Sequence, residues 1–214
     1  MKLVMISDTH ERQNEIVLPE GDVLIHAGDI TNKGSLVKLE AAVNWYKNQP
    51  HTHKIMISGN HDFCFENGQS AKARALVEDA GIIYLEDSGI TIDGVNFYGS
   101  PIQPWFHSWA FNRQRGADIK KHWDMIPDDT HALITHGPPF KIRDEAPKGF
   151  GEFENVGCVD LLNRISDLAQ LKVHVFGHIH NGYGIAKIEQ CSFVNASTCT
   201  ERYEPTNKPL IVEI

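Results

Sequence analysis

The sequence lacks paired cysteine motifs, long apolar runs and an excess of positive charge. It contains only four cysteines in 214 residues and no C-x-x-C pair, which argues against a structural zinc site. The first apolar run, Leu3-Val4-Met5-Ile6, is too short for a signal peptide. No run reaches the roughly 18 apolar residues of a membrane span. We therefore expect free thiols in a reducing compartment, a cytoplasmic protein and no membrane partner.

The charge balance also narrows the choice of partners. The formal net charge is -8, so a general affinity for the nucleic acid backbone is not expected. Hydrophobic residues make up 41% of the chain and charged residues 22%, which is ordinary for a globular protein. No internal repeat, linker or low-complexity tract interrupts the chain. We expect one domain that spans residues 1–214.

Five short apolar runs predict buried strands, because they do not alternate between apolar and polar residues. Each run is followed at once by Gly, Asp, Asn or His. In open α/β sheets, ligands bind beyond the carboxyl ends of the strands. The polar residues can therefore form one binding site only if these strand ends meet at one edge of a sheet. The five runs are Leu3–Ile6, Val23–His26, Lys54–Ser58, Ala132–Thr135 and Val173–Phe176.

The segments between these runs indicate helices, and the later part of the chain indicates antiparallel strands. Helical spacing of apolar residues predicts helices at Ser35–Asn48 and Val159–Leu171, and an alanine-rich stretch that closes at Gly81 predicts one at Ser70–Ala80. Asp93-Gly94 lies between two apolar stretches and predicts a hairpin. More strands are predicted at Gly184–Ile188, Ser192–Asn195 and Leu210–Ile214. An α/β fold with two sheets and helices outside them fits this count.

The polar residues at the strand ends form five short motifs rich in histidine and aspartate. Together they offer two Asp, one Asn and four or five His, which is the ligand set that two divalent cations need. Two metal ions about 3.5–4 Å apart form a clamp for in-line attack on phosphorus. The motifs are Asp8-Thr9-His10, Gly28-Asp29, Gly59-Asn60-His61-Asp62, His136-Gly137 and Gly177-His178-Ile179-His180.

Each motif alone has an ordinary structural explanation. An isolated Asp at a strand end is commonly a turn residue, and a single buried His is commonly a hydrogen-bonded core residue. His26 and His174 lie inside apolar runs, and we interpret them as structural. Two pairs, Asp8 with His10 and His178 with His180, are spaced so that both side chains point the same way. Five such signals in order at strand ends favour a site with two metal ions.

The segment Pro101–Pro127 lacks clear strand character and is rich in aromatic residues. A loop of this length in a compact domain is usually functional. Two interpretations remain open for its side chains, namely ligand binding and packing against the core.

The five motifs and their order resemble the calcineurin-like metallophosphoesterase family. The segment Asn195–Thr200 and the run Pro101–Phe106 resemble one subgroup, the brain-type metallophosphoesterase-domain-containing proteins and their microbial relatives. The resemblance implies a four-layer αββα sandwich. Some members of this subgroup have Gly in place of the first His of G-H-x-H, but this chain keeps His178.

The resemblance also implies a role for each motif residue. Asp29 would bridge the two metal ions. His61 would be the catalytic histidine, next to the phosphate without binding metal, and Asp62 would orient it. The arginine that often accompanies these motifs is absent near Asp29 and Asn60. The first ion would be bound by Asp8, His10 and His180, and the second by Asn60, His136 and His178.

The implied activity is metal-dependent hydrolysis of a phosphodiester, with cyclic nucleotides (2′,3′ or 3′,5′) as expected substrates. The ligand types suit Mn, Fe, Zn or Co ions without distinguishing them. A small phosphodiester is the expected partner, and a nucleic acid polymer is not. The alternatives are a metal-binding interaction scaffold with little catalysis, and a nuclease. The expected substrate-binding residues are Trp105, Phe106, His107 and Trp109, for stacking on a base, and Arg113 and Arg143, for contact with phosphate.

Overall fold

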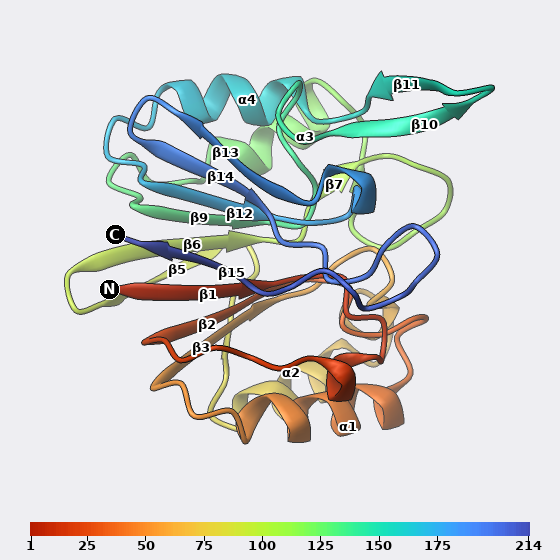
Figure 1. Cartoon of the computed structure of the whole chain (residues 1–214), viewed down its shortest axis with the longest axis vertical. Helices are drawn as coiled ribbons and strands as arrows, with labels where there is room; N and C mark the ends of the chain where they lie inside the picture. Colours follow the sequence, from red (N-terminus) through yellow and green to blue (C-terminus); the bar gives the residue numbers. More distant parts are fainter.

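The computed structural model describes all residues 1–214 and shows four layers, helix–sheet–sheet–helix (Figure 1). The two large sheets lie face to face in the middle of the molecule. Helices α1 and α2 cover the outer face of one sheet, and α3 and α4 cover the outer face of the other. This arrangement confirms the predicted α/β class and the αββα layers. No helix combines the length and the apolar character needed to cross a membrane.

The first sheet has five strands in the order β15-β1-β2-β3-β4. Strands β1 to β4 run parallel to one another, and β15 pairs with β1 in the antiparallel sense. The strands are β1 (Lys2–Ile6), β2 (Val23–Ala27), β3 (His53–Ile57), β4 (Ile83–Tyr84) and β15 (Leu210–Glu213). The helices that cover this sheet are α1 (Leu36–Lys47) and α2 (Ser70–Glu78).

The second sheet has six strands in the order β13-β14-β12-β9-β6-β5. Its four central strands are parallel, and an antiparallel strand closes each edge. The strands are β5 (Ser88–Ile92), β6 (Val95–Ser100), β9 (Ala132–Thr135), β12 (Val173–Phe176), β13 (Gly184–Ile188) and β14 (Cys191–Asn195). The covering helices are α3 (Ala117–Trp123) and α4 (Val159–Ser166).

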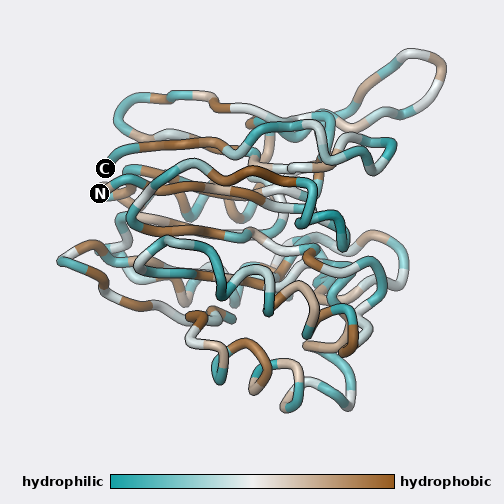
Figure 2. Tube along the Cα trace, turned by 60° about the horizontal axis from the view of Figure 1, so that its bottom comes forward, coloured by the Kyte–Doolittle hydropathy of each residue, from teal (hydrophilic) through white to brown (hydrophobic).

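The continuous apolar runs exist because each central strand is covered on both faces. In β1, Leu3 and Met5 belong to a cluster of 16 buried residues between the two sheets. Val4 and Ile6 point the other way, into a cluster of 31 buried residues that includes the helices. Figure 2 shows the same pattern, with hydrophobic stretches along the strands and hydrophilic residues in the connections. Both faces of a parallel strand are therefore removed from water.

The smaller elements lie at the edge where the parallel strands end. Strands β10 and β11 form a hairpin that projects from the body of the molecule (Figure 1). These elements are β7 (Gln103–Pro104), β8 (Asn112–Arg113), β10 (Glu145–Gly149) and β11 (Glu152–Asn155), with single 3₁₀ turns at Gln13–Glu15, Phe63–Phe65 and His180–Gly182.

The structure corrects the expected secondary structure in two places. The segment Pro101–Pro127 is not a continuous loop, because it contains β7, β8 and helix α3. Helix α4 ends at Ser166 rather than Leu171, although Leu168 and Leu171 remain buried. Apolar spacing continued past the helix because a turn buries those two leucines as well. All four cysteines are unpaired, as predicted.

Candidate metal centre

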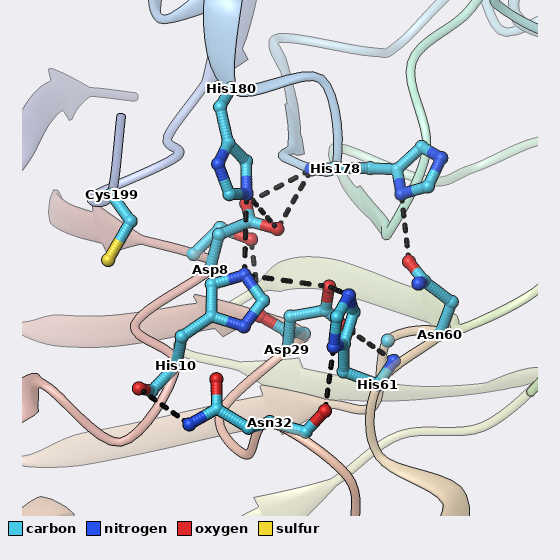
Figure 3. A network of polar contacts seen from close by, with 12 residues as sticks. Asp8, His10, Asp29, Asn32, Asn60, His61, His178, His180 and Cys199 are labelled. Atoms are coloured by element: carbon cyan, nitrogen blue, oxygen red, sulfur yellow. Dashed lines mark hydrogen bonds and ion pairs between the residues drawn. The ribbon is translucent and has the colours of Figure 1, made fainter. Parts of the chain in front are cut away.

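The polar strand-end motifs meet between the two sheets: Figure 3 shows Asp8, Asp29, Asn60 and His178 close together, and His136 lies against Asn60. The sheets are joined there by a bridge between Ser7, after β1, and Ser197, after β14. The two sheets therefore bring their carboxyl ends together across the interface. Strands β1, β2 and β3 deliver Asp8, His10, Asp29, Asn60 and His61, and strands β9 and β12 deliver His136, His178 and His180.

One group of candidate ligands consists of Asp8, His10 and His180, whose ligand atoms all lie within 4.8 Å of one another. Nε2 of His180 lies 3.5 Å from Oδ1 of Asp8 and 3.3 Å from Nε2 of His10. Nε2 of His10 also lies 3.9 Å from Oδ2 of Asp29. Two imidazole nitrogens and a carboxylate therefore surround one point next to Asp29.

A second group consists of Asp29, His136 and His178, again within 4.8 Å. Nε2 of His136 lies 3.4 Å from Oδ2 of Asp29. The side-chain oxygen of Asn60 completes the group, at 2.9 Å from Nε2 of His136 and 2.8 Å from Nδ1 of His178. Asp29 thus lies between the two groups, where a carboxylate that bridges two ions has to be.

Backbone carbonyl groups fix which nitrogen of several histidines faces the site. Nδ1 of His136 lies 2.9 Å from the carbonyl oxygen of Ala27, and Nδ1 of His180 lies 2.9 Å from that of Thr200. A carbonyl only accepts hydrogen bonds, so each Nδ1 carries a proton. The Nε2 atoms therefore face the carboxylates, and a metal ion would take the place of any proton they carry. This is the arrangement of metal-bound histidines, which donate their other N–H to an outer acceptor.

The electrostatics keep the carboxylates charged. Burial by itself would raise the pKa of Asp8, but His180, His136 and His10 hold it well below its usual range. The pKa of Asp29 is lowered in the same way, mainly by His136. Burial opposes the charge on His136, yet Asp29 raises its pKa to about 9. The site therefore offers two buried anions that need cationic partners.

The backbone at the site is strained in a consistent way. Four candidate ligands have positive φ angles, which are 51° for Asp8, 45° for His10, 57° for Asp29 and 67° for His178. Residues other than glycine adopt this region rarely, and such residues cluster at functional sites. Asp8 is also held by Ser197, whose hydroxyl donates to Oδ2 at 2.8 Å. The loops are built to hold these side chains in place.

The carboxylate of Asp62 makes no hydrogen bond to the ring of His61, contrary to the direct contact that the expected orienting role suggests. Nδ1 of His61 instead donates to the carbonyl oxygen of Asn32 at 2.7 Å. Asp62 is fully buried and accepts from the backbone N–H of Gly59 at 2.9 Å and from N–H and Oγ1 of Thr31 at 2.9 and 2.7 Å. Burial, and then the charge of Asp29, raises the pKa of Asp62 to about 6. Asp62 fastens the loop after β3 to the loop after β2.

A pocket of about 300 Å³ opens over the two ligand groups and is lined by Asp29, Asn60 and His61. Of the expected substrate-binding residues, Phe106 and Trp109 line this pocket. The ring of Trp109 lies 4.2 Å from that of His61, measured between centroids, at an angle of 33°. One wall of the pocket is therefore aromatic and is in contact with the expected catalytic histidine.

The other four expected substrate-binding residues lie outside this pocket, namely Trp105, His107, Arg113 and Arg143. Arg113 forms an ion pair with Glu66 at 3.0 Å. Arg143 donates to the carbonyl oxygen of Ile185 at 2.7 Å. The aromatic and basic composition of these segments did not reveal which way each side chain points.

The sequence reasoning missed Tyr203, Asn32 and Ser197. Ser197 follows β14, which runs parallel to β12, so it obeys the same strand-end rule as the predicted motifs. The polar stretch after Val194 was therefore a usable signal. Asn32 acts through its backbone carbonyl group, and Tyr203 belongs to a connection far from any motif. The amino-acid type at these two positions therefore gives no sign of either role.

Comparison with known proteins decides the family. A sequence profile of the calcineurin-like phosphoesterases matches residues 1–182. The chain belongs to the calcineurin-like phosphoesterase family. The predicted family is thereby confirmed, and membership makes the chain a metallophosphoesterase, a hydrolase of phosphate esters.

Relatives and solved structures agree with this assignment. The metallophosphoesterase is 39% identical over 235 residues to human metallophosphoesterase domain-containing protein 1. The match covers all of this chain and 71% of the human protein. The chain is 36% identical to UPF0046 protein K07C11.7 of Caenorhabditis elegans, covering 75% of that protein. The crystal structure of TT1561 from Thermus thermophilus shares the fold, with a TM-score of 0.59 at 11% identity over 91% of this chain and 88% of that one.

Proposed function

We propose that this metallophosphoesterase is a phosphodiesterase with two metal ions, acting on a small diester of the nucleotide type. The observation that supports this most is the position of Asp29. Its carboxylate belongs to the group of His136 and His178 and lies next to His10 of the other group, so that Nε2 atoms face Oδ2 from both sides, at 3.4 and 3.9 Å. Carboxylate, imidazole and amide ligands together suit Mn, Fe, Zn or Co ions.

In this proposal each ion has its own set of ligands. Asp8, His10 and His180 hold the first ion, and Asn60, His136 and His178 hold the second. Asp29 is shared between the two. When bound, such ions supply charge that polarises the phosphoryl oxygens and lowers the pKa of a bound water. The positive φ angles and the carbonyl partners of the histidines keep the ligands in place before any ion arrives.

His61 is the candidate for proton transfer. Its Nδ1–H is fixed on the carbonyl group of Asn32, and its Nε2 atom lies 3.9 Å from Oδ2 of Asp29. The ring lines the pocket, so Nε2 is within reach of a phosphoryl or leaving-group oxygen. His61 also belongs to a third possible ligand group with His10 and Asp29. A metal-binding role is thus the specific alternative that an experiment has to exclude.

The composition of the pocket supports a diester over more highly charged substrates. No lysine or arginine is among its lining residues. A phosphomonoester dianion or a polymer would call for extra cations, whereas a diester carries one negative charge. Phe106 and Trp109 offer an aromatic wall to a base, which favours cyclic nucleotides. The four unpaired cysteines support a cytoplasmic location for this activity.

A substrate panel tests the proposal. The purified protein is loaded separately with Mn²⁺, Zn²⁺, Fe²⁺ or Co²⁺ and assayed with 2′,3′- and 3′,5′-cyclic AMP, bis(4-nitrophenyl) phosphate, 4-nitrophenyl phosphate and single-stranded DNA. We expect faster hydrolysis of the diesters than of the monoester, no cleavage of DNA, and loss of activity on chelation. Full metal content without turnover of any ester would favour the scaffold instead, and cleavage of DNA would favour a nuclease.

A variant of His61 separates proton transfer from metal binding. His61→Ala should lower kcat by roughly 10²–10⁴-fold, the usual contribution of a positioned acid or base. Its metal content should equal that of the parent. His53→Ala, at the far end of β3, is the matched control and should keep full activity. A missing ion in His61→Ala would show that His61 is a ligand and would overturn its assigned role.

A further inference from the structure

A loop near the carboxyl end of the chain places Tyr203 against the candidate metal centre. The ring centroid of Tyr203 lies 4.7 Å from that of His10, 5.5 Å from that of His180 and 6.4 Å from that of His61. The side chain lines the same pocket as Asp29 and is 43% exposed. An aromatic ring is thus open to solvent directly beside His10 and His180, two of the three candidate ligands of the first ion.

The backbone of Tyr203 is strained. Its φ angle is 59°, in the left-handed region that bulky side chains avoid. Such outliers persist only where the surrounding structure holds them, and they cluster at ligand-binding sites. Glycine or asparagine would adopt this angle more easily. The tyrosine is therefore present despite a backbone preference for another residue.

The contacts around this turn tie the ring to the metal centre. The N–H of Tyr203 donates to the carbonyl oxygen of Thr200 at 2.8 Å. The same carbonyl group accepts from Nδ1 of His180 at 2.9 Å. On the other side, Arg12 donates to the carbonyl oxygen of Tyr203 at 3.0 Å. One carbonyl group thus orients both a candidate ligand and the strained tyrosine.

The hydroxyl group of Tyr203 has no hydrogen-bond partner within the chain. The exposed ring does not belong to the hydrophobic core, so core packing does not explain the strained backbone. No lysine or arginine lines the pocket, so no such side chain can hold a substrate there by its charge. The pocket has aromatic surface instead, from Phe106 and Trp109 in one loop and from Tyr203 in another. The aromatic surface therefore comes from two separate segments of the chain.

We propose that Tyr203 is a substrate-positioning residue, whose ring holds the base of a nucleotide ester in place while the phosphate lies at the metal centre. The inference rests on the proposed function for its substrate class. It adds a determinant of specificity outside the metal-binding motifs. Because a stacked base is worth roughly 5- to 150-fold in affinity, the effect of the ring is measurable.

The test uses Tyr203→Asn, which removes the ring and suits the left-handed backbone. With the Mn²⁺-loaded protein, calorimetry measures the dissociation constants of AMP and of inorganic phosphate. We expect AMP to bind roughly 5- to 150-fold more weakly, while phosphate binds as in the parent. Metal content should be unchanged, and the melting temperature should be equal or higher. Tyr203→Phe keeps the ring and should retain most of the AMP affinity.

Glu189→Asn is the matched control. Glu189 also has a positive φ angle, 51°, and lies in the exposed turn between β13 and β14, away from the pocket. It should change the melting temperature in the same direction as Tyr203→Asn without changing AMP binding. A structural role for Tyr203 would instead lower the melting temperature and weaken both ligands together, which would overturn the inference.

Other outcomes are equally decisive. Unchanged AMP affinity in Tyr203→Asn, or a lost metal ion, would contradict the positioning role. If the parent hydrolyses no ester but Tyr203→Asn still loses AMP affinity, the proposed function fails and the inference stands. If the parent hydrolyses cyclic nucleotides and the kcat/KM of Tyr203→Asn equals that of the parent, the inference fails alone.

Discussion

Replacing Thr9 by valine should weaken metal binding although Thr9 is not a ligand. Thr9 lies between Asp8 and His10, and its hydroxyl oxygen is 2.9 Å from Nε2 of His26. The backbone N–H of Gly28 donates to Nδ1 of His26 at 3.2 Å, so Nδ1 is the acceptor and Nε2 carries the proton. His26 therefore donates to Thr9. One buried imidazole links the loop of Asp8 and His10 to the residue that precedes Asp29.

The magnitude follows from burial. His26 is 0% exposed, and burial, opposed by the charges of Asp8 and Asp29, lowers its pKa to about 3, so the ring is neutral. Valine has nearly the shape of threonine and leaves the Nε2–H of His26 without a partner. A buried unsatisfied donor costs about 1–3 kcal/mol of unfolding free energy. The contact acts on the backbone between Asp8 and His10 rather than on a ligand side chain, so we expect a loss in metal affinity no larger than the about 10–100-fold that removing a ligand's own hydrogen-bond partner costs.

Two measurements check this prediction. Urea unfolding of the metal-free protein gives the change in stability, and titration with Mn²⁺ gives the affinity. Thr9→Ser keeps the hydroxyl group and should recover most of the affinity. The reasoning would be refuted if Thr9→Val bound Mn²⁺ as tightly as the parent, or if Thr9→Ser were as impaired as Thr9→Val.

Two further predictions concern the pocket and the response to pH. Trp109→Ala should lower kcat/KM for cyclic AMP about 5- to 150-fold. Trp105→Ala should leave it unchanged, because of these two residues only Trp109 lines the pocket and contacts His61. Equal losses in both variants would show that the loop supports the fold rather than the substrate. Burial lowers the pKa of His174 to about 3, so the native state binds fewer protons than the unfolded state below pH 6.5 and stability falls on acidification. His174→Gln should therefore reduce the slope of unfolding free energy between about pH 4 and pH 6 by up to about 1.4 kcal/mol per pH unit, and an unchanged slope in denaturant titrations would contradict this.

The sequence predicted those parts of the fold whose signal is local. The strands β1, β2, β3, β9 and β12 appear within a residue or so of their predicted bounds, because strands buried on both faces require continuous apolar runs. The Asp93-Gly94 turn was equally readable, since few residues adopt its backbone angles. Both features depend on neighbours in sequence and on burial alone.

The parts that the sequence did not predict depend on which side chains meet across the fold. Helix α3 buries only Ile119 and Trp123, and the β10–β11 hairpin is largely exposed, so neither carries a strong apolar pattern. The partner of His61 is a backbone carbonyl group, which every residue has, so residue type gave no sign of Asn32. Arg113 is neutralised by Glu66, which is 47 residues away in sequence. Such pairings are visible only once the chain has folded.

The apolar runs placed each candidate ligand at a strand end, the resemblance implied its role, and the structure brings these side chains together around Asp29. What residue types alone did not provide was the orientation of the imidazole rings. The carbonyl groups of Ala27 and Thr200 accept from Nδ1 of His136 and His180, so both rings face the site through Nε2. These contacts join residues 109 and 20 positions apart, so no local pattern records them.

The central claim is that Asp29 bridges two metal ions, and elemental analysis of the parent and of Asp29→Asn tests it most directly. Both proteins are loaded with Mn²⁺, freed of excess metal and analysed for metal per chain, with turnover of bis(4-nitrophenyl) phosphate measured on the same samples. We expect two ions per chain in the parent, and loss of bound metal together with loss of turnover in Asp29→Asn. One ion per chain in the parent, or two ions with near-normal turnover in Asp29→Asn, would contradict it.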